Sequence, residues 1–177
     1  MKTLTLLRHA KSDWSDAVRR DFDRPLNDRG RRAAWTMGTH MAAEGLRFDK
    51  VVASPALRVR DTLDEVARGY GGGLDPQFDQ QVYLASAATL LDLVRGTAPG
   101  VGRLLLVGHN PGLEDLVLAL ASEDADSPMR REVEIKYPTA TLAEIALAGD
   151  DWDEAATGRI VRFVRPRDLD PALGPDS

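Results

Sequence analysis

Cysteine is absent from the 177-residue chain, which excludes a disulfide framework, a thiolate metal cluster and a cysteine nucleophile. Histidine is scarce, with three residues, so any active site must draw on these side chains and on the carboxylates. No apolar run approaches the length of a membrane span, and the N-terminus lacks the apolar core of a signal peptide. We therefore expect a cytoplasmic protein with no membrane partner.

Positive charge is also in short supply. The 23 Lys and Arg residues are outnumbered by 28 Asp and Glu residues, and the formal net charge is -5. This balance argues against a nucleic-acid partner, because such binding depends on many cations that displace counterions from the phosphates. Any anion site must therefore be a local cluster of cationic side chains.

The remaining composition, 43% hydrophobic and 29% charged, is typical of one soluble globular domain. We place that domain at residues 1–167 and expect a flexible tail at 168–177, where the sequence reads "DLDPALGPDS". No repeat or linker divides the chain. No pattern sets an oligomeric state, so a monomer is the default expectation.

Short β-branched or Leu-rich runs alternate with longer segments of helical period, as in α/β domains with a largely parallel sheet. The last two of the predicted strands are expected to form a hairpin. The predicted strands cover 3–7, 49–53, 103–107, 140–147 and 159–165, with a weaker candidate at 77–82. The predicted helices cover 27–45, 55–69, 86–97 and the segment after Pro111.

Conspicuous polar side chains follow three of these strands at the point where each strand ends. Arg8 and His9 follow the first strand, Arg58 follows the second and His109 follows the third. Because ligands of open α/β sheets gather beyond the carboxyl ends of the strands, we expect these side chains to form one site. Arg58 and His109 also lie near predicted helix starts, whose free N–H groups attract anions. The pattern therefore favours a phosphate ligand.

The residue types in this predicted site suit phosphoryl transfer. Arg8 and Arg58 can fork onto phosphate oxygens and neutralise their charge. His9 offers a nitrogen nucleophile that would become a phosphoramidate, and the two arginines would favour its neutral form. His109 is expected to donate a hydrogen bond to the phosphoryl oxygens. We expect no metal and no cofactor, because two isolated histidines among arginines are a poor ligand set.

Four segments, "LLRHAKSDW", "DRPLNDRG", "SPALRVRDT" and "LLLVGHNPG", together resemble the histidine phosphatase superfamily, in particular its SixA-like phosphohistidine phosphatases. The resemblance covers residues 3 to about 165. It implies a phosphoglycerate-mutase-like three-layer α/β/α sandwich with a mostly parallel mixed central sheet. It also implies that His9 is the phosphorylated nucleophile, that Arg8 and Arg58 bind the phosphate, and that His109 is the second histidine of the site.

Arg24, in the segment "DRPLNDRG", matches a family stretch near the phosphate and is therefore a candidate substrate-binding residue. A salt bridge with Asp21 or Asp23 would explain its position equally well. The mixed-charge loop from 13 to 23 follows the predicted nucleophile. We expect it to rim the entrance to the site, with Trp14 packed beneath it.

The chain departs from many members of the superfamily in one respect, because no carboxylic acid that would protonate an alcohol leaving group is evident. Asp79, in "QFDQQVYLAS", is the nearest candidate, and it could equally face solvent. Imidazole leaves from phosphohistidine far more readily than an alkoxide leaves from a phosphoester. The missing acid therefore favours a phosphohistidine substrate.

Three functions are compatible with these residues. The favoured one is a phosphatase that uses a phosphohistidine intermediate and acts on protein phosphohistidine, since the short chain has no evident insertion for a lid. A phosphatase of small phosphoesters, such as sugar phosphates or nucleotides, would use the same site but would need a leaving-group acid. A non-catalytic phosphate-binding module would not need a histidine nucleophile between two arginines.

Overall fold

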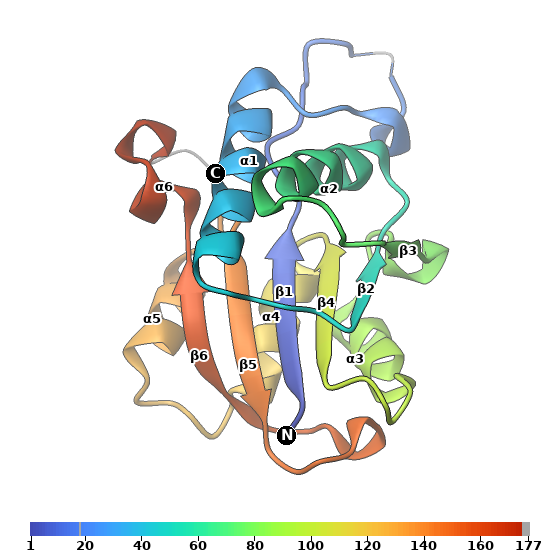
Figure 1. The fold of residues 1–177 in the computed structure, drawn as a ribbon, viewed down its shortest axis with the longest axis vertical. Helices are drawn as coiled ribbons and strands as arrows, with labels where there is room; N and C mark the ends of the chain where they lie inside the picture. Colours follow the sequence, from blue (N-terminus) through green and yellow to red (C-terminus); the bar gives the residue numbers. More distant parts are fainter. Residues whose placement is uncertain (18, 175–177) are drawn as a thin grey trace.

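The computed structural model describes residues 1–17 and 19–174, which form a six-stranded sheet with helices on both faces (Figure 1). The order of the strands across the sheet is β3-β2-β4-β1-β5-β6. The strands are β1 (Thr3–Arg8), β2 (Lys50–Ala53), β3 (Gln77–Phe78), β4 (Arg103–Gly108), β5 (Leu142–Leu147) and β6 (Gly158–Val164).

The pairing within the sheet is mixed. β4 pairs in parallel with β1 and β2, and β2 pairs in parallel with β3. β5 runs antiparallel to both β1 and β6, so the predicted hairpin of the last two strands and the mostly parallel mixed sheet are confirmed. The weak strand candidate at 77–82 is reduced to β3, because Gln80–Val82 turn into a short 3₁₀ helix. The carboxyl ends of β1, β2 and β4 lie together at the upper end of the sheet in Figure 1.

Helices cover the two faces of the sheet unequally. One face packs against α1 (Asp28–Ala43) and α2 (Leu57–Tyr70), and the other packs against α3 (Ala87–Arg95), α4 (Gly112–Leu120) and α5 (Pro128–Ile135). The three-layer α/β/α sandwich is therefore confirmed. α5 was not predicted, because its sequence is mainly charged and Val133 is its one buried residue.

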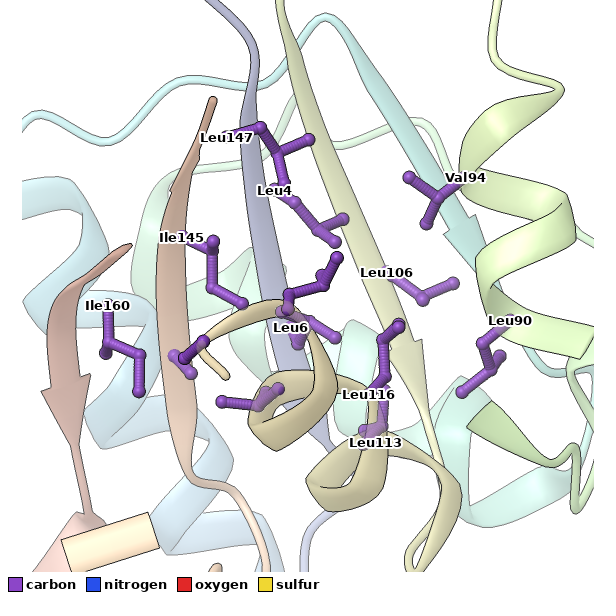
Figure 2. Close-up of a cluster of buried hydrophobic side chains, with 14 of the residues drawn as sticks. Leu4, Leu6, Leu90, Val94, Leu106, Leu113, Leu116, Ile145, Leu147 and Ile160 are labelled. Atoms are coloured by element: carbon purple, nitrogen blue, oxygen red, sulfur yellow. The ribbon is translucent and has the colours of Figure 1, made fainter. Parts of the chain in front are cut away.

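Two apolar cores separate the sheet from its helical layers. Side chains of β1 alternate between them, which explains why that strand reads as a continuous apolar run: Leu4 and Leu6 face one core and Leu7 faces the other. Figure 2 shows the first core, in which Leu4, Leu6, Leu106 and Ile145 of the sheet lie against Leu90, Leu113 and Leu116 of α3 and α4.

The start of α1 and its contact with α2 are set by two local features. The side chain of Asn27 accepts a hydrogen bond from the backbone N–H of Gly30 and so caps the start of the helix. Farther along, the α-carbon of Gly38 lies so close to the carbonyl oxygen of Val66 that no β-carbon would fit. This close approach holds α2, and therefore Arg58 at its start, against α1.

The predicted tail at 168–177 is wrong for the described part of that segment. Residues Pro166–Leu169 form α6 and Pro171–Leu173 form a 3₁₀ turn, and Leu173 is buried in the core beneath α1 with 4% exposure. Arg32 of α1 forms a salt bridge with Asp170. The proline- and glycine-rich composition is typical of loops, but the burial of Leu173 and the contact of Asp170 with α1 hold this segment in place. Residues 175–177 lie outside the described residues.

A search of the described helices finds none with both the length and the apolar character needed to cross a bilayer.

Candidate functional site

His9 lies directly beyond β1, where neighbouring segments hold its backbone. Its N–H donates to the carbonyl of Gly108 at 3.1 Å, and its own carbonyl accepts from the N–H of Ala140 at 3.0 Å. The imidazole Nδ1 lies 2.7 Å from the carbonyl oxygen of Ala10. Because a carbonyl can only accept, Nδ1 must carry the proton in that contact, and Nε2 keeps its lone pair.

The electrostatic surroundings of His9 keep its ring neutral. The pKa of His9 is lowered to about 3, chiefly by burial; a hydrogen bond to Ala10 opposes the shift, and the nearby His109, Arg58 and Arg8 add to it. At neutral pH the ring therefore presents an unprotonated Nε2. A nitrogen in this state can act as a nucleophile.

Arg58 is the second residue of α2, and its side chain is only 6% exposed. Its Nη2 donates to Nδ1 of His109 at 3.2 Å and to Oδ2 of Asp21 at 3.0 Å. Its Nη1 donates to the backbone carbonyl of Asp21 at 2.8 Å. The guanidinium therefore joins the loop after β1 to the loop after β4.

His109 follows β4 and is 3% exposed. Its ring centroid lies 5.3 Å from that of His9, and its Nε2 lies 2.8 Å from Oγ of Ser54. Since Arg58 can only donate, Nδ1 of His109 accepts, and the proton of the neutral ring lies on Nε2 facing Ser54. Burial, with Arg58 and Arg8 adding to it, lowers the pKa of His109 to about 3.

Arg8 completes the group of four residues predicted from the strand ends. Its Nη1 donates to the backbone carbonyl of Tyr137 at 2.8 Å, while its buried Nε has no hydrogen-bond partner among the described residues. Burial lowers the pKa of Arg8, whereas the charge of Glu114 raises it. The structure thus brings Arg8, His9, Arg58 and His109 together from three loops, as the strand topology predicts.

Arg24 lies at the edge of this group. Its guanidinium carbon lies 3.8 Å from the ring centroid of Trp14, and its Nε lies 4.0 Å from Oδ1 of Asp21. The side chain is 12% exposed. Trp14 was expected to pack beneath the loop, but it is 67% exposed and instead covers the guanidinium. The predicted salt bridge between Arg24 and Asp21 is therefore loose, because Arg58 and Tyr83 hold the carboxylate more closely.

Comparisons with known proteins agree with this geometry. Residues 4–82 match the model of the histidine phosphatase superfamily (branch 1). A solved structure assigned as the phosphohistidine phosphatase SixA of Agrobacterium tumefaciens is 30% identical, covers 93% of this chain and 98% of its own, and superposes with a TM-score of 0.80. The chain belongs to the histidine phosphatase superfamily.

Two further proteins resemble this chain, one in sequence and the other in fold alone. The uncharacterized protein Rv1276c of Mycobacterium tuberculosis is 32% identical over 166 residues, which cover 91% of this chain and 100% of the relative. The mycobacterial glucosyl-3-phosphoglycerate phosphatase Rv2419c is 17% identical, with a TM-score of 0.62 over 90% of this chain and 97% of its own. The latter likeness is one of fold alone, and the fold does not select a substrate.

Sequence reasoning about the candidate site missed several residues that hold it together. Thr62 is fully buried, accepts from the N–H of Ala10 at 2.9 Å and donates to the carbonyl of Arg58 at 2.6 Å. Its spacing of four residues from Arg58 on one helix could have indicated this role. Asp21 and Tyr83, whose hydroxyl donates to Oδ2 of Asp21 at 2.7 Å, carried no such signal.

Asp79, the one candidate acid from the sequence, caps a 3₁₀ helix. Its carboxylate accepts from the N–H of Gln81 at 2.9 Å. It also lines a cavity of about 460 Å³ between β2, β3 and α3, which none of the four central site residues lines. Its carboxylate thus has a structural partner of its own.

No group of three or more His, Asp or Glu side chains among the described residues is placed to hold a metal ion.

Proposed function

We propose that this member of the superfamily is a phosphatase that forms a phosphohistidine intermediate at His9 and acts on phosphohistidine side chains of other proteins. The observation that carries the proposal is the state of His9. Its Nδ1 is held by the carbonyl of Ala10 and its ring is neutral, so Nε2 is free to attack phosphorus. Arg8 and Arg58 lie close enough to lower its pKa, and they supply the cations that a phosphoryl group requires.

In the first step, the lone pair of His9 Nε2 forms the new bond to phosphorus while the bond to the leaving group breaks. The guanidinium groups of Arg8 and Arg58 neutralise the charge on the phosphoryl oxygens. Arg24 lies beside Asp21, on the loop that follows His9, and we assign it a supporting role in substrate binding. Water then attacks the phosphoenzyme, and the electron pair of the breaking P–N bond returns to Nε2.

The expected role of His109 as a hydrogen-bond donor requires a change in its tautomer. Nδ1 of His109 accepts from Arg58 in this structure. When the guanidinium turns to a phosphoryl group, Nδ1 can donate to that group if the ring proton moves from Nε2 to Nδ1. The hydroxyl of Ser54 can accept from Nε2 or donate to it, so it is compatible with both tautomers.

Two features support protein phosphohistidine as the substrate. Asp79 is engaged as a helix cap, so the chain relies on a leaving group that needs little protonation, as an imidazole does. Two of the three connections beside the site are short: residues 54–56 link β2 to α2, and residues 109–111 link β4 to α4, whereas the longer loop after β1 carries Asp21. Connections of this length suit an open site that a side chain of another protein can reach.

The test is a panel of substrates ranked by kcat/KM. The panel contains a histidine protein phosphorylated with phosphoramidate, free phosphohistidine and glucose 6-phosphate. We expect the phosphorylated protein to rank first and the sugar phosphate last, with an acid-labile phosphoenzyme trapped during turnover. A sugar phosphate that outranks both phosphohistidine substrates would contradict the proposal.

A further inference from the structure

Asp21 is a carboxylate inside a site built for an anion. It lies in a 3₁₀ turn, Asp21–Asp23, on the loop that follows His9. Its Oδ2 receives hydrogen bonds from Arg58 Nη2 at 3.0 Å and from the hydroxyl of Tyr83 at 2.7 Å. The side chain remains 44% exposed. It is therefore both fixed in place and accessible to a ligand.

This carboxylate is a disadvantage for binding phosphate alone. Burial raises the pKa of Asp21, but the hydrogen bond from Tyr83 and the charge of Arg58 outweigh it and lower the pKa below its usual value, so the group is ionised at neutral pH. A phosphoryl dianion bound at Arg58 would lie beside a like charge. Phosphate binding therefore does not explain why a carboxylate lies beside Arg58.

A phosphohistidine substrate differs from a phosphoester in a way that fits this charge. The leaving group of an ester is an oxygen, whereas that of phosphohistidine is a ring with a second nitrogen. When that second nitrogen is protonated, the ring is cationic and the P–N bond breaks readily. A carboxylate can accept a hydrogen bond from that N–H and stabilise the cation.

We propose that Asp21 is the specificity-determining residue of the site, which accepts a hydrogen bond from the leaving imidazole of a phosphohistidine substrate. The inference rests on the proposed function. Nη2 of Arg58 donates both to Oδ2 of Asp21 and to Nδ1 of His109, which places the carboxylate next to the second histidine of the site.

The substrate ring enters protonated on the nitrogen that does not carry the phosphoryl group, with that N–H donated to Asp21. The lone pair of His9 Nε2 bonds to phosphorus, and the pair of the breaking P–N bond returns to the departing nitrogen. The ring leaves as neutral imidazole with its N–H still directed at Asp21, and Asp21 itself neither gains nor loses a proton.

A purely structural role for Asp21 makes a different prediction. If the carboxylate only orients Arg58, its loss should weaken every substrate equally, because all substrates present the same phosphoryl group. If it also contacts the imidazole, its loss should weaken phosphohistidine much more than an ester. The ratio of kcat/KM for phosphohistidine to kcat/KM for a phosphoester therefore separates the two roles.

The experiment compares free phosphohistidine with 4-nitrophenyl phosphate in the wild type and in Asp21→Asn, a change that keeps the shape and removes the charge. We expect kcat/KM for phosphohistidine to fall about 10- to 100-fold, the range for a hydrogen bond to a charged group. We expect kcat/KM for 4-nitrophenyl phosphate to fall far less, because its leaving group makes no contact with the carboxylate and only the positioning of Arg58 is disturbed.

Two matched variants complete the design. Asp23→Asn changes a carboxylate of the same turn that instead pairs with the exposed Arg20, and it should leave the ratio unchanged. Tyr83→Phe keeps the ring that lies against His109 but removes the hydroxyl on Asp21, and it should lower the ratio in the same direction as Asp21→Asn. Tyr83→Phe also serves as the decisive variant if Asp21→Asn does not fold.

The outcomes separate the inference from the function on which it rests. Equal losses on both substrates, no loss on either, or the same shift in Asp23→Asn would each overturn the role of Asp21 and leave the phosphatase proposal intact. A wild type that cleaves 4-nitrophenyl phosphate but not phosphohistidine would overturn the proposed function, and the role of Asp21 with it.

Discussion

Nη2 of Arg58 donates a hydrogen bond to Nδ1 of His109 at 3.2 Å, although Arg58 lies at the start of α2 and His109 follows β4. The same guanidinium reaches Asp21 through both of its terminal nitrogens. Only a planar fork can serve these partners together. Arg58 therefore acts as the link through which the loops after β1 and β4 share one geometry.

Replacing Arg58 with Lys should lower kcat/KM for 4-nitrophenyl phosphate by about 100-fold or more, the scale for losing a preorganised charge donor. A lysine keeps the charge but cannot hold His109 and Asp21 at once. Steady-state kinetics measures the effect, with Arg60→Ala as the control, since Arg60 lies on the same helix but packs over Phe78. Kinetics like those of the wild type would remove Arg58 from the site.

Replacing His9 with Ala should abolish turnover and the acid-labile phosphoenzyme. The chain has no cysteine, and the ring of His109 is engaged by Arg58 and Ser54, so we expect no other side chain within residues 1–17 and 19–174 to replace the nucleophile. Rapid acid-free quenching with radiolabelled substrate measures the intermediate. His40→Ala, in α1, is the matched control and should retain both properties; a labelled phosphoenzyme in His9→Ala would refute the mechanism.

Lowering the pH from 7.5 to 5 should destabilise the fold. The pKa values of His9 and His109 are about 3 in the folded protein and 6.5 in their ordinary state, so the unfolded chain binds more protons between these values. The free energy of unfolding is therefore greatest above pH 6.5 and falls as the pH drops toward 3.

Thermal melts across this range measure the effect. Each buried histidine contributes a slope of at most about 1.4 kcal/mol per pH unit. His109→Gln should reduce the slope, because its side chain has no ring to protonate. If His109→Gln showed the same pH dependence as the wild type, groups other than His109 would cause the loss of stability at low pH.

Rates on a graded series of phosphomonoesters should depend steeply on the pKa of the leaving group. With the carboxylate of Asp79 engaged at its helix cap, we expect it to supply no proton that would offset the charge developing on the leaving oxygen. The measurement is kcat/KM across the series in the wild type and in Asp79→Asn, because kcat alone can report breakdown of a shared intermediate. A shallow dependence that steepens in Asp79→Asn would instead identify Asp79 as a general acid.

The sequence by itself determined the layers of the fold and the convergence of Arg8, His9, Arg58 and His109. Hydrophobic periodicity is a local property, so it marks strands and helices without knowledge of their partners. Parallel strands place their carboxyl ends on one edge, so residues after separate strands meet without any need to know the packing in detail. Composition is likewise a local property, so the loop-like sequence after residue 167 gave the wrong expectation of a free tail.

Only the tertiary structure decided how those four residues are connected. Asp21 reaches Arg58 across 37 positions and Tyr83 across 62, and neither distance leaves a trace in local periodicity. The proton positions on His9 and His109 likewise depend on which fixed donor or acceptor each ring nitrogen meets. Such contacts are set by side-chain packing between loops, and they turn a set of phosphate-binding residue types into a site with a defined nucleophile.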